Sequence, residues 1–354
     1  MMDLNSSYTE AVALLKSLIA IPSISREEEA VCNFLEEYLK AKGFGPRRKN
    51  NNIYVLSKEF DAAKPTLLLN AHLDTVKPGV GWLQDPYTPV EKEQRIYGLG
   101  SNDDGASLVC LLATFLLLQD TKQTYNLIFL ASAEEEISGK NGIESVLNEL
   151  PVCSLVIVGE PTGMHPAVAE KGLMVLDCIS RGVAGHAARN EGKNAIYKAL
   201  PDIEWFQNYT FPKASQMLGA VKTTVTQINA GTQHNVIPAE CTFVVDVRSN
   251  DCYSNQELYE LIKANVTCEV IPRSFRLNSS QISLEHPFVQ KAIQLGRKPF
   301  GSPTLSDQAL IPYPSVKIGP GESSRSHTSE EYICLDELKE AITIYTQLLD
   351  GLTL

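Results

Sequence analysis

Apolar residues recur at helical spacing at the start of the chain and then give way to short apolar runs. Segments 8–20 and 27–42 predict two amphipathic helices, and Gly43 follows the second where a C-terminal glycine is common. Further on, apolar runs at 66–69, 126–131 and 155–158 alternate with helix-forming segments at 106–119 and 142–149. Strands that alternate with helices indicate an α/β domain with a mostly parallel sheet flanked by helices.

The pattern changes after Gly172. Segments 174–180, 219–229 and 241–247 alternate between apolar and polar residues, which is typical of half-buried antiparallel strands. Helical spacing returns at 287–295 and again at 335–349. We therefore predict one α/β domain made of residues 1–169 and 286–354, interrupted by an inserted α+β domain of residues 170–285.

Composition narrows the possible functions. The 354 residues hold 31 Lys plus Arg against 42 Asp plus Glu, a net charge of −11 that disfavours nucleic-acid binding. The longest apolar run, 108–118, is too short to span a membrane, and residues 1–10 lack a secretion signal, so we expect a cytoplasmic protein. The eight cysteines form no Cys-x-x-Cys pair, which favours reduced, mostly buried thiols.

Acidic residues and histidines follow the predicted strands, where open α/β sheets bind ligands. His72 and Asp74 come directly after the run at 66–70. Residues two apart at a strand end point the same way, so Asp74 can orient the His72 ring. A single His-x-Asp match is more often an ordinary histidine, and this motif alone carries little weight.

The segment Gly98–Gly105 opens like a dinucleotide fingerprint, but Asp103 stands where the third glycine would meet a phosphate. A cation site therefore fits better than a nucleotide site. Glu134–Glu136 follow the run at 126–131, Glu160 follows the run at 155–158, and His327 comes late in the chain. Two histidines and three carboxylates at these places suit a mixed nitrogen and oxygen site for two divalent metals.

The order of these motifs resembles the M20 family of dinuclear zinc amidohydrolases, which includes amino-acid deacylases and peptidases. The motifs are His-x-Asp, Gly-x-Gly-x-x-Asp-Asp, an acidic triplet, Gly-Glu-Pro-Thr and a late histidine. The inserted segment is similar to the family as well, at 185–188, 192–195, 235–238 and 246–248. The resemblance covers nearly the whole chain.

The resemblance implies a role for each residue of the predicted centre. Two divalent ions, zinc or alternatively cobalt, would be bridged by Asp103, with His72 and Glu160 completing one site and Glu136 and His327 the other. Glu135 would be the general base. A register shifted by one residue would instead make Glu134 the base and Glu135 a ligand. The family also implies a cis peptide bond between Asp103 and Asp104.

The resemblance further implies that the inserted domain is a lid that forms a homodimer. In that case His186 would reach the active site of the neighbouring subunit and stabilise the oxyanion. We expect Arg248 to hold a substrate carboxylate, and name Asn235 and Arg325 as further substrate contacts. The remaining histidines are not assigned to the metals; these are His165, His234 and His286.

The implied function is metal-dependent hydrolysis of the acyl amide of an N-acyl amino acid. N-acetylornithine, in arginine biosynthesis, is the first choice because an acidic chain attracts a cationic side chain. The segment Thr304–Asp307 departs from the desuccinylase pattern, which weakens a succinyl substrate. The alternatives are N-acetylcitrulline, an N-succinyl amino acid, or a dipeptide or tripeptide. An inactive, regulatory metal-binding homologue is disfavoured because every ligand position and the base are present.

Overall fold

The computed structural model describes residues 3–119, 121–189 and 191–354, which contacts divide into two compact units. The first unit takes in residues up to Val168 together with Gln281–Phe300 and Ser306–Leu354, and the second takes in Ala169–Ser280 and Gly301–Leu305. The domain boundaries expected from the sequence, residues 1–169 with 286–354 for one domain and 170–285 for the inserted one, remain a prediction.

Within the described part of the chain, the main sheet has nine strands, and its centre is parallel. β6 (Asn126–Ser132), β3 (Thr66–His72), β7 (Leu155–Val158) and β17 (Ser315–Lys317) lie side by side in that order, all parallel. The mostly parallel sheet expected from the sequence is confirmed. Strands on either side of this centre complete the sheet: β1 (Arg47–Lys49), β2 (Asn52–Leu56), β8 (Ala167–Glu170), β15 (Ser280–Gln281) and β16 (Phe300–Ser302).

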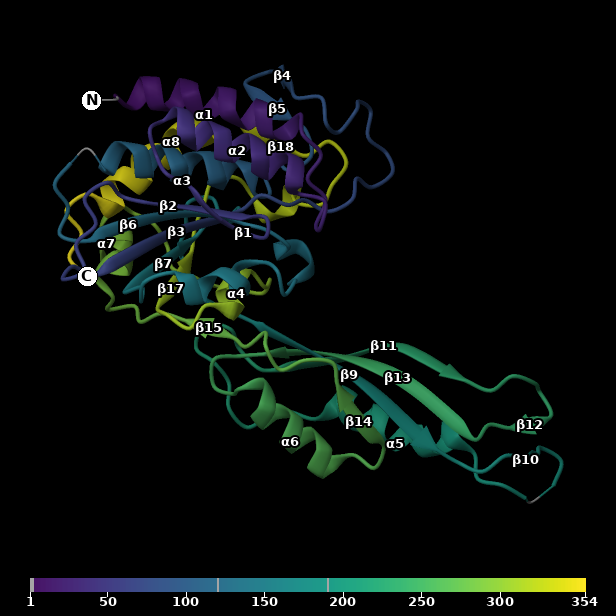
Figure 1. Cartoon of the computed structure of the whole chain (residues 1–354). Helices are drawn as coiled ribbons and strands as arrows, with labels where there is room; N and C mark the ends of the chain where they lie inside the picture. Colours follow the sequence, from purple (N-terminus) through teal and green to yellow (C-terminus); the bar gives the residue numbers. More distant parts are fainter. Residues whose placement is uncertain (1–2, 120, 190) are drawn as a thin grey trace. The chain divides into compact units, whose positions relative to one another are not determined.

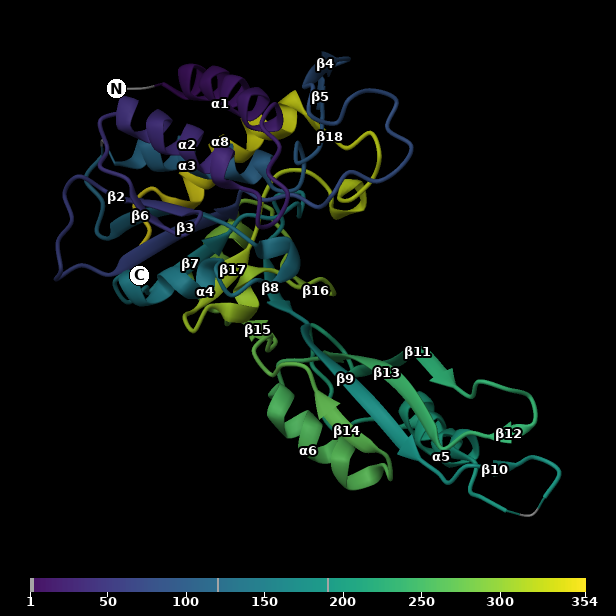
Figure 2. The same cartoon turned by 45° about the vertical axis from the view of Figure 1, so that its right-hand side comes forward.

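Helices cover both faces of this sheet. α1 (Leu4–Ile19), α2 (Glu29–Ala41), α3 (Gly105–Leu118) and α8 (Leu335–Leu349) lie on one face (Figure 1). α3 is buried almost all round because it packs against the sheet and against both α1 and α8, which explains why its sequence is apolar on every side. α4 (Ile143–Val146) lies on the other face (Figure 2). Its Ile143 and Val146 share an apolar cluster with Leu68, Ile128 and Leu130.

The remaining elements of the first unit are short. α7 (Pro287–Gln294) packs on α8, and a small antiparallel sheet joins β4 (Val90–Lys92), β5 (Arg95–Tyr97) and β18 (Tyr332–Cys334). The sequence did not predict this small sheet. The described residues of this unit also form short 3-10 helices: η1 (Glu135–Ile137), η2 (Leu147–Glu149), η3 (Asp307–Leu310) and η4 (Ser323–Arg325).

The second unit is an antiparallel sheet covered on one face by two helices. Its strands run in the order β11 (Lys222–Ala230), β13 (Glu240–Ser249), β9 (Gly172–Arg181) and β14 (Glu269–Pro272). α5 (Ala195–Asn208) and α6 (Asn255–Asn265) share one apolar core with β9 and β13. β10 (Gly185–His186) and β12 (Val236–Ile237) form a separate short ribbon. The predicted antiparallel α+β character is confirmed.

The sequence led us to expect reduced, mostly buried cysteines and no membrane-spanning segment. All eight cysteines are free, and five of them are buried. Among the described residues, no helix combines the length and the apolar character that crossing a membrane requires.

Candidate metal centre

The predicted ligands gather at the carboxyl edge of the parallel strands. His72 is the last residue of β3, Glu135 and Glu136 lie just after the end of β6, and Glu160 lies just after β7. β3, β6 and β7 are parallel neighbours, so their carboxyl ends share one edge of the sheet. The four side chains are therefore brought together by the topology of the sheet.

Asp103 and His327 come from two loops and complete the cluster. One carboxylate oxygen of Asp103, Oδ1, lies 3.1 Å from His72 Nε2, while the other, Oδ2, lies 3.7 Å from His327 Nε2. His327 Nε2 also lies 3.0 Å from Glu136 Oε2. Asp103 thus stands between the two histidines with one oxygen facing each, the placement that a bridging carboxylate needs.

Among the residues that the structure describes, two groups of side chains have donor atoms close enough to hold a divalent ion. They are His72 with Glu135 and Glu160, and His72 with Asp103 and Glu136, with all ligand atoms of a group within 4.8 Å of one another. Imidazole and carboxylate donors suit zinc, cobalt and manganese. Glu135, expected to be the base, is close enough here to count among the donors, so its role remains a proposal.

The acidic triplet turns so that its members contact different partners. Glu134 has a left-handed backbone (φ 54°), and its carboxylate accepts hydrogen bonds from the Asn141 side-chain and backbone N–H groups at 3.0 and 3.3 Å. Glu136 lies beside His327, and Glu135 Oε2 lies 3.9 Å from His72 Nε2. Glu134 is thus bound to Asn141, whereas Glu135 lies near His72. Which of the two is the base stays a prediction.

Asp74 lies in the site, but its carboxylate binds other groups in addition to lying near the His72 ring, its expected partner. The His72 Nδ1 atom is 2.9 Å from the backbone carbonyl of Asp74 and 3.6 Å from its carboxylate. The carboxylate accepts the backbone N–H groups of Glu135 and Glu136 at 3.0 and 3.2 Å, and the Ser25 hydroxyl at 2.7 Å. Asp74 therefore holds the acidic turn in place, while its main chain holds the His72 ring.

The cluster has an excess of buried negative charge. Burial raises the pKa of the Glu135 and Glu160 carboxyl groups well above the ordinary value. Burial alone would lower the pKa of the His72 imidazole, but Asp103 and Asp74 outweigh it and raise that pKa. The hydrogen bond to Glu136 raises the pKa of His327 to about 9. Such a donor set favours positive charge at its centre, which fits divalent ions.

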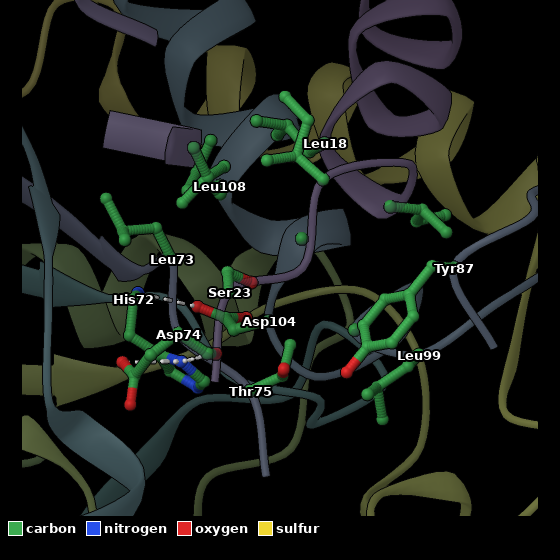
Figure 3. Close-up of a pocket in the computed structure, with 15 residues that line it drawn as sticks. Leu18, Ser23, His72, Leu73, Asp74, Thr75, Tyr87, Leu99, Asp104 and Leu108 are labelled. Atoms are coloured by element: carbon green, nitrogen blue, oxygen red, sulfur yellow. Dashed lines mark hydrogen bonds and ion pairs between the residues drawn. The ribbon is translucent and has the colours of Figure 1, made fainter. Parts of the chain in front are cut away.

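A cavity of about 30 Å³ lies behind His72, between α1, α3 and the end of β3 (Figure 3). Asp104 lines it and accepts the backbone N–H of His72 at 3.3 Å, which ties the end of β3 to the start of α3. Burial raises the pKa of Asp104 to about 8.

The peptide bond between Asp103 and Asp104 is cis, as the resemblance implied.

Two sequence-predicted residues lie together in the short ribbon of the second unit. His186, which is exposed, pairs with Val236 in that ribbon, and its Nδ1 accepts the backbone N–H of Ala188 at 3.1 Å. The backbone carbonyl of Asn235, just before β12, accepts the backbone N–H of Ala187 at 3.0 Å. The motifs at 185–188 and 235–238 are thus neighbours in space.

Both predicted arginines are held by carboxylates of their own unit. Arg248, on β13, binds Asp246 through two bonds of 2.8 and 3.1 Å. Arg325 binds Glu337 through two bonds of 2.7 and 3.0 Å, and its guanidinium lies over the Tyr332 ring. Neither guanidinium is free to turn to a substrate without giving up such a pair, so both substrate roles remain proposals.

Sequence reasoning missed some polar residues that support the centre. Asp307 is buried and accepts the Ser132 hydroxyl at 2.7 Å and the Asn70 amide at 2.9 Å, which links the ends of β6 and β3. Burial raises its pKa to about 6. The one available signal was a carboxylate within the otherwise small or apolar segment Thr304–Asp307. Asn102 and Glu331 were also given no role, although both stand beside predicted ligand loops.

The chain is similar to a known protein family over most of its length. The model of peptidase family M20/M25/M40 matches residues 68–351 of the chain. The chain belongs to this family. The M20 match spans the first metal-ligand motif, the whole second unit and the His327 loop, so the resemblance inferred from the motifs is confirmed.

Curated relatives and a solved structure are similar over nearly the full length. This M20 chain is 25% identical to acetylornithine deacetylase of Proteus mirabilis, with 99% of each covered. It is 28% identical to the LysW-lysine/LysW-ornithine hydrolase of Sulfurisphaera tokodaii, with 96% of this chain and 95% of the relative covered. A Bacillus subtilis M20 protein described as a dinuclear metal binding peptidase matches at TM-score 0.73 and 17% identity, over 98% and 100%. The chain is therefore an M20-family hydrolase.

Proposed function

We propose that this M20 hydrolase cleaves the acyl amide of an N-acyl amino acid, with N-acetylornithine as the first substrate. The observation that carries the proposal is the position of Asp103 between His72 and His327, with one oxygen toward each. Such a carboxylate suits a pair of divalent ions. The acetylornithine deacetylase of Proteus mirabilis, similar over its full length, supports the choice of substrate.

The residues present fit two divalent ions, most simply zinc. Asp103 would be shared, His72 and Glu160 would hold one ion, and Glu136 and His327 the other. Three carboxylates offset three of the four positive charges of two dications, and both imidazoles are neutral ligands. Bound ions of this kind supply Lewis acidity toward water and toward an amide carbonyl.

Glu135 is proposed as the group that moves the proton. It stands at the end of β6 beside the cluster and is not needed to complete either ligand set. In this role its carboxylate accepts a proton from the attacking water and passes it to the amine that leaves. Asp74 fixes the Glu135 backbone, so the base and the His72 ring keep a constant position relative to each other.

We also propose that the second unit forms a homodimer and supplies His186 to the neighbouring site. Apolar side chains are exposed on α5 and on the edge strand β11: Tyr197 is 71%, Leu200 51% and Ile228 53% exposed. The outer edge of β11 is also the end of its sheet, so its backbone groups can pair with another chain. Both features support an interface on this unit.

The substrate proposal is tested by kcat/KM for a panel of compounds with purified, metal-loaded protein. The panel holds N-acetylornithine, N-acetylcitrulline, N-succinylornithine, N-acetylmethionine and a glycine-containing dipeptide. We expect N-acetylornithine to be the best substrate, because the chain carries a net charge of −11 and favours a cationic side chain. A tenfold advantage for the succinyl compound or the dipeptide, about 1.4 kcal/mol in transition-state binding, would replace this assignment.

A further inference from the structure

The loops that carry Asp103 and His327 leave the same end of one strand pair. β5 and β18 are antiparallel, and Tyr97, the last residue of β5, pairs with Tyr332, the first residue of β18. Loop 98–104 follows β5, and loop 319–331 precedes β18. Asp103 and His327 are far apart in sequence, but their loops are therefore joined to neighbouring ends of two paired strands.

Glu331 ties the second loop to the backbone of the first. Its side chain is 1% exposed, and its Oε1 atom accepts the backbone N–H groups of Asn102 and Asp103 at 2.8 and 2.9 Å. The other oxygen, Oε2, accepts the N–H of Gly100 at 3.2 Å. One buried carboxylate thus fixes three peptide groups of the turn that presents Asp103.

Asn102 makes the reverse connection. It is fully buried, and its side-chain oxygen accepts the backbone N–H of Glu322 at 3.1 Å. Its side-chain nitrogen donates to the Glu322 carbonyl at 3.2 Å and to the Ser326 hydroxyl at 3.3 Å. Asn102 is next to Asp103 in sequence and Ser326 is next to His327, so each loop is held at the residue beside its ligand.

We infer that Glu331 and Asn102 are positioning residues that set the separation of the Asp103 carboxylate and the His327 imidazole, and thereby the metal affinity of the centre. His327 is 53% exposed at its side chain, so its own packing does little to hold it. Outer partners that orient metal ligands typically change affinity by about 10–100-fold when they are removed. This inference rests on the metal centre proposed above, but not on the choice of substrate.

The experiment measures zinc binding to chelator-treated protein by calorimetry, together with the melting temperature of the metal-free protein. E331Q replaces one acceptor oxygen with an N–H₂ group that opposes a backbone N–H. N102A removes the hydrogen bonds from the Asn102 side chain to Glu322 and Ser326. E330Q is the matched control, because Glu330 is the neighbouring glutamate and accepts the backbone N–H of Leu83 at 2.8 Å, outside loop 98–104.

We expect E331Q and N102A each to weaken zinc binding by about tenfold or more, and E330Q to change it by less than about twofold. Activity lost at limiting zinc should return at saturating zinc, since both residues are buried and neither is among the proposed ligands or substrate contacts. The double variant should lose less than the product of the two single losses, because both residues fix the same pair of loops.

Zinc binding within about twofold of the parent in both single variants would overturn the inference, even if their melting temperatures fall, because the role would then be only structural. If E331Q does not fold, N102A carries the same test alone. Absence of deacylase activity in the parent would defeat the proposed substrate, yet it would leave the zinc titrations fully interpretable.

Discussion

Glu135 and Glu136 are adjacent residues with different surroundings. Glu136 lies 3.0 Å from His327, whereas Glu135 Oε2 approaches His72 Nε2 only to 3.9 Å. Both backbone N–H groups are held by the same Asp74 carboxylate, so an amide in place of either side chain leaves the turn intact. Substitutions at these two positions therefore test the proposed division between proton transfer and metal binding.

We predict that Glu135→Gln keeps its metal and loses at least about a hundredfold in kcat, the usual scale for removing a general base. Glu136→Gln, its matched control, should lose metal. Metal content by atomic spectroscopy and kcat with saturating substrate check both variants. Loss of metal from Glu135→Gln, with both ions kept by Glu136→Gln, would show that the ligand is Glu135.

Individual side chains also mark what the sequence could predict about the centre. The spacing of His72 and Asp74 predicted that the two would lie together, and they do. It could not predict that the Asp74 carboxylate accepts N–H groups of Glu135 and Glu136, because that contact depends on how β3 and β6 are paired. Glu331 was beyond prediction for the same reason: its partners are the N–H groups of residues 100–103, remote in sequence.

Elements with a strong local pattern were predicted closely, as were the buried strands β6 and β7, but several other short elements were not. The helix expected at 335–349 is α8 (Leu335–Leu349), which begins with a capping box of Cys334 and Glu337. The helix expected at 142–149 becomes α4 and a 3-10 turn, and it ends before Leu150, which is extended because Pro151 follows it. β17 has three residues, and only its place between β7 and β8 makes it a strand.

Asp202 joins two elements of the second unit. It lies on α5, is 3% exposed, and its carboxylate accepts the backbone N–H groups of Thr267 and Cys268 at 2.8 and 2.9 Å, just before β14. The Thr267 hydroxyl also donates to it. A buried acid with these partners stabilises the unit, because its removal leaves peptide groups without acceptors.

We predict that Asp202→Ala lowers the free energy of unfolding of the second unit by about 2–4 kcal/mol. Glu204→Ala, an exposed position on the same helix, should change it by less than about 0.5 kcal/mol. Urea unfolding is followed by fluorescence of Trp205, in α5, with Trp82 replaced by Phe so that Trp205 is the sole tryptophan. Equal midpoints for the two variants would contradict the role given to Asp202.

At the scale of the whole molecule, the proposed dimer makes a prediction about mixed subunits. His186→Ala should fold normally and lose most activity if this exposed histidine acts across an interface. In heterodimers of His186→Ala with Glu135→Gln, one of the two sites has both groups intact. We expect activity close to half of the parent value per heterodimer, measured after subunit exchange.

The matched control is His186→Ala mixed with itself under the same exchange conditions, which should stay inactive. If subunit exchange is demonstrated by mass and activity does not recover, His186 acts within its own chain or does not act in the reaction. A parent protein that sediments as a monomer would reject the dimer outright.

The position of β17 in the main sheet also matters while the protein is being made. β7, whose four residues are apolar and fully buried, has β3 on one side and β17 on the other. β17 leaves the ribosome only after the entire second unit has been translated. Until then the nascent chain carries an apolar strand with one unpaired edge, the feature most prone to pair with another chain. We therefore expect chaperones that act during translation to bind the open edge of β7.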